Sequence, residues 1–415
     1  MRIVFTGGGT GGHITPVVSV VRELKRIYPH EHISPLELFF MGPKGAFEEK
    51  ALLDEGVQIE YILGAKLRRY ISLSNLVDIV KLPIGFLQAL WQLYKVMPDI
   101  VWAKGGFGSL SIGFVAWLYR IPLIIHESDT IPGLSNRFLS IFATEIGVCF
   151  EQALRYFPPQ KTALVGNPIR RSLFEGDPNE ARSYFTLSGE EGRPIIMVMG
   201  GSQGAQRLNT LIAESLHDLL PSYELIHQCG ATNYDEFVTE LRDVHGIDPE
   251  KNPYYHVRGY LEEHEQAMAY SVVDLFISRA GAGTIFEIAA LGKPSILIPL
   301  PHAASEHQTR NAYHFARRGA SVVLQQHNLT PHLLLNEIHH ILKNPLLAKQ
   351  MSVRAKEIAK PDASLIIATN LVELAIKKQI VPPWLTGESS SEHHEDQHQT
   401  TTKNEKRFWK IAKKK

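Results

Sequence analysis

The chain repeats one local pattern near the start of each half: an apolar run typical of a buried strand, then a glycine-rich turn, then a helix. RIVFTG at residues 2–7 leads into GGTGG, and IIMVM at residues 195–199 leads into GGSQG, with apolar residues at helical spacing from Leu208 to Leu219. Strand-like runs and helical patterns keep alternating, which predicts parallel βαβ units. We therefore expect an α/β protein of two Rossmann-like, doubly wound domains facing each other across a cleft.

The expected strands are apolar runs bounded by turn residues. They begin at residues 2, 36, 58, 99, 122 and 145 in the first half and at residues 195, 223, 255, 274, 294 and 320 in the second. With 415 residues, the chain is long enough for two domains of ordinary size. We predict domains at 1–168 and 169–375, the final helices of the second returning toward the first, and a polar linker and basic tail at 376–415.

The tail is expected to be disordered because the stretch from residue 388 to 404 is polar and cannot bury a core. It ends in KRFWKIAKKK, which has six basic side chains and no acid.

Charge and cysteine content narrow the class of protein. The formal net charge is zero, which gives no global attraction to nucleic acid. Cys149 and Cys229 lie in or beside apolar runs, which indicates core packing in a reducing compartment. The N-terminus enters a strand directly and no apolar run is long enough to span a bilayer, so we expect a cytoplasmic protein.

The first glycine-rich loop satisfies G-x-G-x-x-G, but the expected second strand ends in Gly42-Pro43-Lys44, without the acidic residue that holds a ribose in nicotinamide enzymes. A phosphate cradle remains the better prediction. Thr15 and Pro16 predict that the helix starts directly after His13. His13 would then lie at the carboxyl end of a strand, where the helix N-terminus keeps its ring neutral and able to accept a proton. Alternatively, His13 bonds only a loop carbonyl.

The second glycine-rich turn predicts another anion cradle, in which Ser202 and backbone amides face a helix N-terminus. It has no G-K-[ST], which disfavours an NTPase. In SRAGAGTIFE, Glu287 would accept from ribose hydroxyls, or Thr284 and Glu287 would form only a capping box. Gln308 and Asn311 would recognise sugar hydroxyls, or cap the helix that follows.

Two groups of basic residues complete the candidates. Arg170, at the expected hinge, would reach the nucleotide or form a structural salt bridge. A second group flanks an apolar run, which suits either a core helix or an anionic membrane surface. Its basic members are Lys66, Arg68, Arg69 and Lys81, and its apolar members are Ile84, Phe86, Leu87, Leu90 and Trp91.

Taken together, these motifs resemble the MurG family, the N-acetylglucosaminyltransferases that complete lipid II in peptidoglycan synthesis. The similarity spans roughly residues 1–375. It is carried by GGGTGGHITP, GGFGS, HESDTIPG, VGNPIR, GGSQGA, SRAGAGTIFE and EHQTRNA. Two departures are Phe107, where the family commonly has Tyr, and Asp129, where it commonly has Asn.

The resemblance implies a GT-B fold without metal or cofactor, and a role in cell-wall synthesis, cell shape and cell division. The donor would be UDP-N-acetylglucosamine and the acceptor lipid I, an undecaprenyl diphosphate at the cytoplasmic face of the membrane, where the protein would be peripheral. The implied donor contacts in the second domain are Ser202 to the phosphates, Glu287 to the ribose, Leu261 to the uracil and Gln308 to the sugar. Ala282, Gly283 and Thr284 would contact the nucleotide region. Arg170 would approach from the hinge, and Thr10, Gly11 and Gly12 from the opposite domain.

The implied reaction inverts the anomeric carbon, so a base must take the proton of the attacking hydroxyl. His13 is the candidate base, with Glu127 and Asp129 as alternatives. Asp129 would otherwise bond a sugar hydroxyl. Three other functions stay open: a UDP-sugar 2-epimerase, a nicotinamide dehydrogenase, and a non-catalytic lipid-binding protein.

Overall fold

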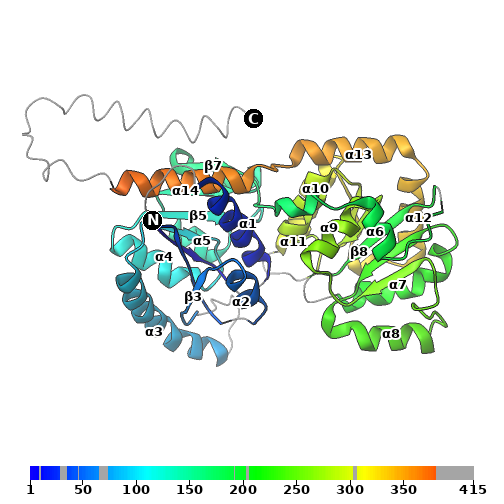
Figure 1. Cartoon of the computed structure of the whole chain (residues 1–415), viewed down its shortest axis with the longest axis horizontal. Coiled ribbons are helices and arrows are strands. Elements are labelled where there is room, and N and C mark those ends of the chain that lie inside the picture. Colours follow the sequence, from blue (N-terminus) through cyan, green and yellow to red (C-terminus); the bar gives the residue numbers. More distant parts are fainter. Residues whose placement is uncertain are drawn as a thin grey trace, which may run out of the picture. The chain divides into compact units, whose positions relative to one another are not determined.

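The chain divides into two compact units, residues 1–168 with 362–415 and residues 169–361. Figure 1 shows each of them as helices packed around a sheet. The computed structural model describes residues 1–8, 11–28, 35–44, 46–64, 73–190, 192–201, 205–301 and 306–379. Most of the predicted linker and tail therefore lies outside the described residues.

The sheet of the first unit has seven parallel strands in the order β3-β2-β1-β4-β5-β6-β7. The strands are β1 (Arg2–Thr6), β2 (Glu37–Gly42), β3 (Gln58–Tyr61), β4 (Ile100–Ala103), β5 (Leu123–Glu127), β6 (Glu145–Val148) and β7 (Thr162–Leu164). Six of them confirm the predicted runs. The sequence did not predict β7, because three residues are too short to form a recognisable apolar run.

Helices cover both faces of this sheet. They are α1 (Gly11–Ile27), α2 (Ala46–Leu53), α3 (Leu73–Val96), α4 (Ser109–Leu118), α5 (Leu134–Leu139) and α14 (Ala363–Gln379). Alternate β1 residues feed two cores: Ile3 and Phe5 pack with α1 and α14, whereas Val4 packs with α3 and α4. Burial on both faces explains why the strands are continuous apolar runs.

The last described helix belongs to the first unit. Figure 1 shows α14 crossing α1, and the two helices pack against each other. The second unit accordingly ends at residue 361 rather than at residue 375.

The start of α1 differs from the prediction. The helix begins at Gly11, so His13 lies in its first turn rather than on the loop before it, and Pro16 is inside the helix. Proline favours the first helical position but can occur later when one backbone hydrogen bond is given up.

The second unit repeats the topology with six parallel strands in the order β10-β9-β8-β11-β12-β13. They are β8 (Ile195–Met199), β9 (Glu224–Gln228), β10 (Tyr255–Arg258), β11 (Leu275–Ser278), β12 (Ser295–Leu297) and β13 (Val322–Val323). The helices are α6 (Pro178–Tyr184), α7 (Gln206–Leu219), α8 (Tyr234–Asp243), α9 (Glu263–Val272), α10 (Ala282–Leu291), α11 (His307–Arg317), α12 (Pro331–Leu342) and α13 (Pro345–Ile358). The expected apolar face of α7, from Leu208 to Leu219, is buried.

The strand order reverses between β1 and β4 in one sheet and between β8 and β11 in the other. In open α/β sheets, ligands bind at the carboxyl ends of the strands beside such a reversal. Each glycine-rich turn follows a strand beside the reversal, β1 in one sheet and β8 in the other.

Cys149 and Cys229 are free and buried, as expected for core packing. None of the described helices is long and apolar enough to cross a membrane.

Candidate active site

In the first unit, glycines let two loops pack backbone against backbone. Gly106, after β4, has φ +81°, and a Cβ on it would lie 2.4 Å from the carbonyl oxygen of Gly8. A Cβ on Gly108 would lie 2.6 Å from the oxygen of Gly7. Only glycine fits these positions, so the loop after β1 rests directly on the loop after β4.

His13 lies beside this junction. Its side chain is half-buried in the first turn of α1, and its Cε1 would be 3.5 Å from a Cβ on Gly106. Gly11 and Gly12 open the same helix, and Gly12 is exposed. Thr10 lies outside the described residues. His13 is therefore at the carboxyl edge of the sheet, as predicted.

A buried lysine organises the ends of β4 and β5. Lys104 is 1% exposed, and its Nζ lies 2.6 Å from His126 Nδ1 and 3.0 Å from Asn167 Oδ1, with Ser128 Oγ also in reach. Burial and the Lys104 charge hold the pKa of His126 well below its usual value. The neutral ring then donates from Nε2 to the carbonyl of Gly166, 2.9 Å away, and accepts from Lys104 at Nδ1.

Glu127 holds the loop that follows β5. Its Oε1 accepts from the backbone N–H of Asp129 at 3.0 Å, and its Oε2 from the N–H of Gly133 at 3.1 Å and from Asn136 Nδ2 at 2.9 Å. Burial, to 4% exposure, and the charge of Asp129 raise the pKa of Glu127 to about 7, while the three donors oppose the shift. Glu127 therefore positions Asp129, whose own side chain is half-buried.

In the second unit, Arg170 joins α9 to α10. Its Nη2 lies 2.6 Å from Gln266 Oε1 and 3.4 Å from Glu287 Oε1, and its Nη1 lies 3.5 Å from Glu263 Oε2. The hydroxyl of Tyr270 donates to Glu287 Oε2 at 3.2 Å. The structural salt bridge that the sequence left open for Arg170 is therefore present, with two carboxylates.

Glu287 is not a capping residue. α10 begins at Ala282, with Gly281 as an N-cap that makes no side-chain capping bond, so Thr284 is already inside the helix. The capping-box alternative is wrong for this reason. Glu287 is 7% exposed; burial raises its pKa, and the charge of Arg170 opposes that rise.

The first turn of α10 faces open space. A Cβ on Gly281 or Gly283 would meet no atom within 4 Å, and neither glycine has a positive φ. Ala282 is buried and Thr284 is half-buried. Leu261, in the loop that joins β10 to α9, is buried. Ser202 lies outside the described residues.

The amide side chains of α11 contribute to structure. Gln308 Oε1 accepts from the backbone N–H of Leu300 at 3.0 Å, which ties α11 to the loop after β12. Asn311 is completely buried. Within the described ranges, no three His, Cys, Asp or Glu side chains are grouped so that they could hold a metal ion.

Sequence reasoning missed Lys104 and Asn167. The available indication was the lysine in WAKGG, which directly follows a fully apolar strand. A side chain at that position lies at the carboxyl end of the strand, where open α/β sheets bind ligands.

Family models match both units: the glycosyltransferase family 28 N-terminal domain at residues 3–148 and the C-terminal domain at residues 195–366. Two curated relatives, from Thermodesulfovibrio yellowstonii and Bacillus cereus, are each 34% identical, over 88% and 83% of this chain and 96% and 92% of their own. Both are named UDP-N-acetylglucosamine–N-acetylmuramyl-(pentapeptide) pyrophosphoryl-undecaprenol N-acetylglucosamine transferases.

Solved structures agree with this assignment. The crystal structure of Acinetobacter baumannii MurG matches with a TM-score of 0.68 and 26% identity, covering 90% of this chain and 99% of that one. A UDP-GlcNAc 2-epimerase from Neisseria meningitidis has a TM-score of 0.61 over 90% of this chain and 100% of its own, but at 13% identity it shows the fold alone. The chain therefore belongs to the MurG family of glycosyltransferases, within glycosyltransferase family 28.

Proposed function

We propose that this glycosyltransferase moves N-acetylglucosamine from UDP-N-acetylglucosamine to the 4-hydroxyl of the N-acetylmuramic acid of lipid I, forming lipid II. The observation that carries the proposal is the match to relatives named for this transfer, at 34% identity over 83–88% of the chain. The match runs through both units, so it includes both glycine-rich switch points.

The donor would bind in the second unit. The open first turn of α10 offers backbone N–H groups and a helix N-terminus to a diphosphate. Glu287 would accept from the ribose hydroxyls through its carboxyl oxygens, which Arg170 and Tyr270 hold in place. The other donor contacts proposed from the family are Ser202, Leu261, Ala282, Gly283, Thr284, Gln308, Arg170 and, from the first unit, Thr10, Gly11 and Gly12.

The acceptor hydroxyl would lose its proton to His13. His13 lies in the first turn of α1, beside the junction of the loops after β1 and β4, where a general base would have to stand. Asp129 is the better of the two alternative bases, because both oxygens of Glu127 are occupied by N–H donors. Backbone N–H groups at the glycine-rich turns would stabilise the departing UDP without a metal.

The first unit would bind the cytoplasmic face of the membrane through α3. Ile84, Leu87 and Trp91 are exposed, the last two to 65% and 62%, while Phe86 and Leu90 are half-buried against the core. The helix thus combines a core face with an exposed apolar stripe that suits a membrane interface. Its predicted basic flank at Lys66, Arg68 and Arg69 lies outside the described residues, as does the basic tail.

A UDP-N-acetylglucosamine 2-epimerase is the alternative, favoured only by shared architecture, because several solved neighbours are named as such enzymes.

One assay separates the two functions. The full-length protein is incubated with radiolabelled UDP-N-acetylglucosamine, with and without a lipid I analogue. We expect label in the lipid product only when the acceptor is present. Conversion of the nucleotide sugar into its 2-epimer without acceptor would establish the alternative, and a lack of transfer to the analogue would refute the proposed function.

A further inference from the structure

A basic pocket lies at the amino ends of the strands in the second unit, on the sheet edge opposite the glycine-rich turn. Pro194, Asp274 and Pro294 line it, and each directly precedes a strand: β8, β11 and β12, respectively. The pocket is an open hollow of about 1030 Å³, which is large enough for a small molecule.

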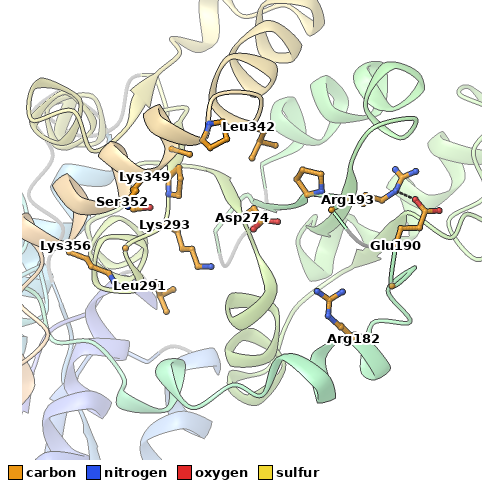
Figure 2. A pocket seen from close by; sticks show the side chains of 17 residues that line it. Arg182, Glu190, Arg193, Asp274, Leu291, Lys293, Leu342, Lys349, Ser352 and Lys356 are labelled. Carbon is orange, nitrogen blue, oxygen red and sulfur yellow. Dashed lines mark hydrogen bonds and ion pairs between the residues drawn. The ribbon is translucent and has the colours of Figure 1, made fainter.

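Cationic side chains outnumber carboxylates in the lining of this basic pocket. They are Arg182, Arg193, Lys293, Lys349 and Lys356. Figure 2 shows them around the hollow together with the two lining carboxylates, Glu190 and Asp274.

Only one of the two lining carboxylates forms an ion pair with a cation of the pocket. Glu190 pairs with Arg193 at 2.8 Å, and Asp274 Oδ2 accepts from the backbone N–H of Ile195 at 2.9 Å. The side chains of Arg182 and the three lysines make no hydrogen bond or ion pair with any residue in the described ranges. Four positive charges are therefore available to a ligand.

Packing forces two of these charges together. The stem of Lys356 crosses the α10 C-cap so closely that a Cβ on Gly292 would lie 2.2 Å from Lys356 Cε. This brings Lys356 beside Lys293, the next residue after that glycine. Burial lowers the pKa of Lys293, and the charge of Lys356 lowers it further, whereas Asp274 opposes the change. A bound anion would relieve this repulsion.

Apolar side chains also line the basic pocket and would hold an organic group. They include Leu291, Leu342, Pro345 and Ala348. We propose that the basic pocket binds a phosphorylated small molecule of the nucleoside diphosphate or triphosphate class, with its phosphates on Lys293 and Lys356.

This pocket is separate from the proposed donor site. α10 carries Ala282 in its first turn and Leu291 in its last, and its 10 residues span about 15 Å. The inference does not depend on the proposed reaction.

Titration calorimetry of the full-length protein at low salt tests the proposal, with inorganic tripolyphosphate and ATP as probes. The double variant Lys293→Met, Lys356→Met removes both charges but keeps the hydrocarbon stem over Gly292. We expect it to bind both probes roughly tenfold to a hundredfold more weakly, the effect of losing charge-assisted hydrogen bonds. The charge-preserving pair Lys293→Arg, Lys356→Arg should restore binding.

Two controls locate the effect. Arg354 is an exposed cation on α13, the helix that also carries Lys356, and it pairs with Glu357 outside the pocket. Arg354→Gln should therefore leave binding of the probes unchanged. Glu287→Ala alters the proposed donor site and should also leave it unchanged. Equal binding by wild type and the Lys→Met double variant, weaker binding in Glu287→Ala alone, or no binding of either probe to the wild type would each overturn the proposal.

Discussion

Replacing Glu127 with glutamine should change how the stability of the first unit depends on pH. Burial raises the pKa of Glu127 from 4.5 to about 7, and the charge of Asp129 adds to this. A carboxyl group with a raised pKa binds its proton more tightly in the folded state. Its stabilising contribution is therefore complete below pH 4.5 and is lost as the pH rises toward 7. At roughly 1.4 kcal/mol per pKa unit, the contribution is about 3 kcal/mol.

Glutamine also disturbs the hydrogen bonds of Glu127. The carboxylate accepts from three N–H donors, and the amide nitrogen of glutamine cannot accept from any of them. This loss lowers the free energy of unfolding by about 1–3 kcal/mol. The titration of Glu127 adds a pH-dependent effect. The free energy of unfolding of the wild type minus that of the variant should be about 2–3 kcal/mol larger at pH 5 than at pH 8.

Urea unfolding followed by tryptophan fluorescence measures this difference. Trp91, Trp102 and Trp117 lie in the first unit and residues 169–361 contain no tryptophan, so a change in fluorescence on unfolding reports on the first unit. Trp384 and Trp409 lie outside the described residues. The buried ring of Trp102 lies 5.6 Å from that of His126, beside the affected loop. Glu60→Gln, at a half-buried carboxylate on β3, serves as the matched control. The free energies of unfolding of wild type and Glu127→Gln could instead differ by the same amount at pH 5 and pH 8. The N–H donors would then outweigh burial in setting the pKa of Glu127, and our reasoning would be refuted.

Three further predictions follow from the two sites and the tail. Glu287→Ala should weaken UDP-N-acetylglucosamine binding by about 1.5–3 kcal/mol in calorimetry, and unchanged affinity in a folded variant would leave Glu287 only as a partner of Arg170. His13→Ala should lower turnover on lipid I by about 10²–10⁴-fold and remove the acidic limb of the pH–rate profile, whereas near-parent turnover would point to Asp129 as the base. Truncation before Glu388 should reduce binding to anionic liposomes at low salt but spare activity on a soluble lipid I analogue, and equal liposome binding would exclude the tail as an anchor.

The sequence predicted the sheets well because the strands of parallel sheets are buried on both faces and are continuous apolar runs. Two failures have physical causes. β7 has only three residues, and it pairs with β6 at the sheet edge, where a short strand needs no long apolar run. The start of α1 was placed too late because Pro16 is typical of the first helical position, yet it lies inside the helix.

The site was predicted less completely, because its geometry depends on contacts between distant segments. The glycine-rich turns were found from spacing alone. Lys104, His126 and Asn167 converge from the ends of different strands, and no local pattern links them. Thr284 and Glu287 show the opposite problem: their spacing fits a capping box, but the helix begins earlier than that pattern requires.

Burial also distinguishes Glu127 from Asp129, which the sequence offered as equivalent alternatives for the catalytic base. Glu127 directs both oxygens to N–H donors and is inaccessible, whereas Asp129 is half-buried and has its backbone fixed by Glu127. The charge at Asp129, where the family commonly has Asn, raises the pKa of Glu127 and also acts on the buried ammonium of Lys104. An aspartate at this position therefore adds to the upward shift in the pKa of Glu127 and partly offsets the lowering of the pKa of Lys104 by burial.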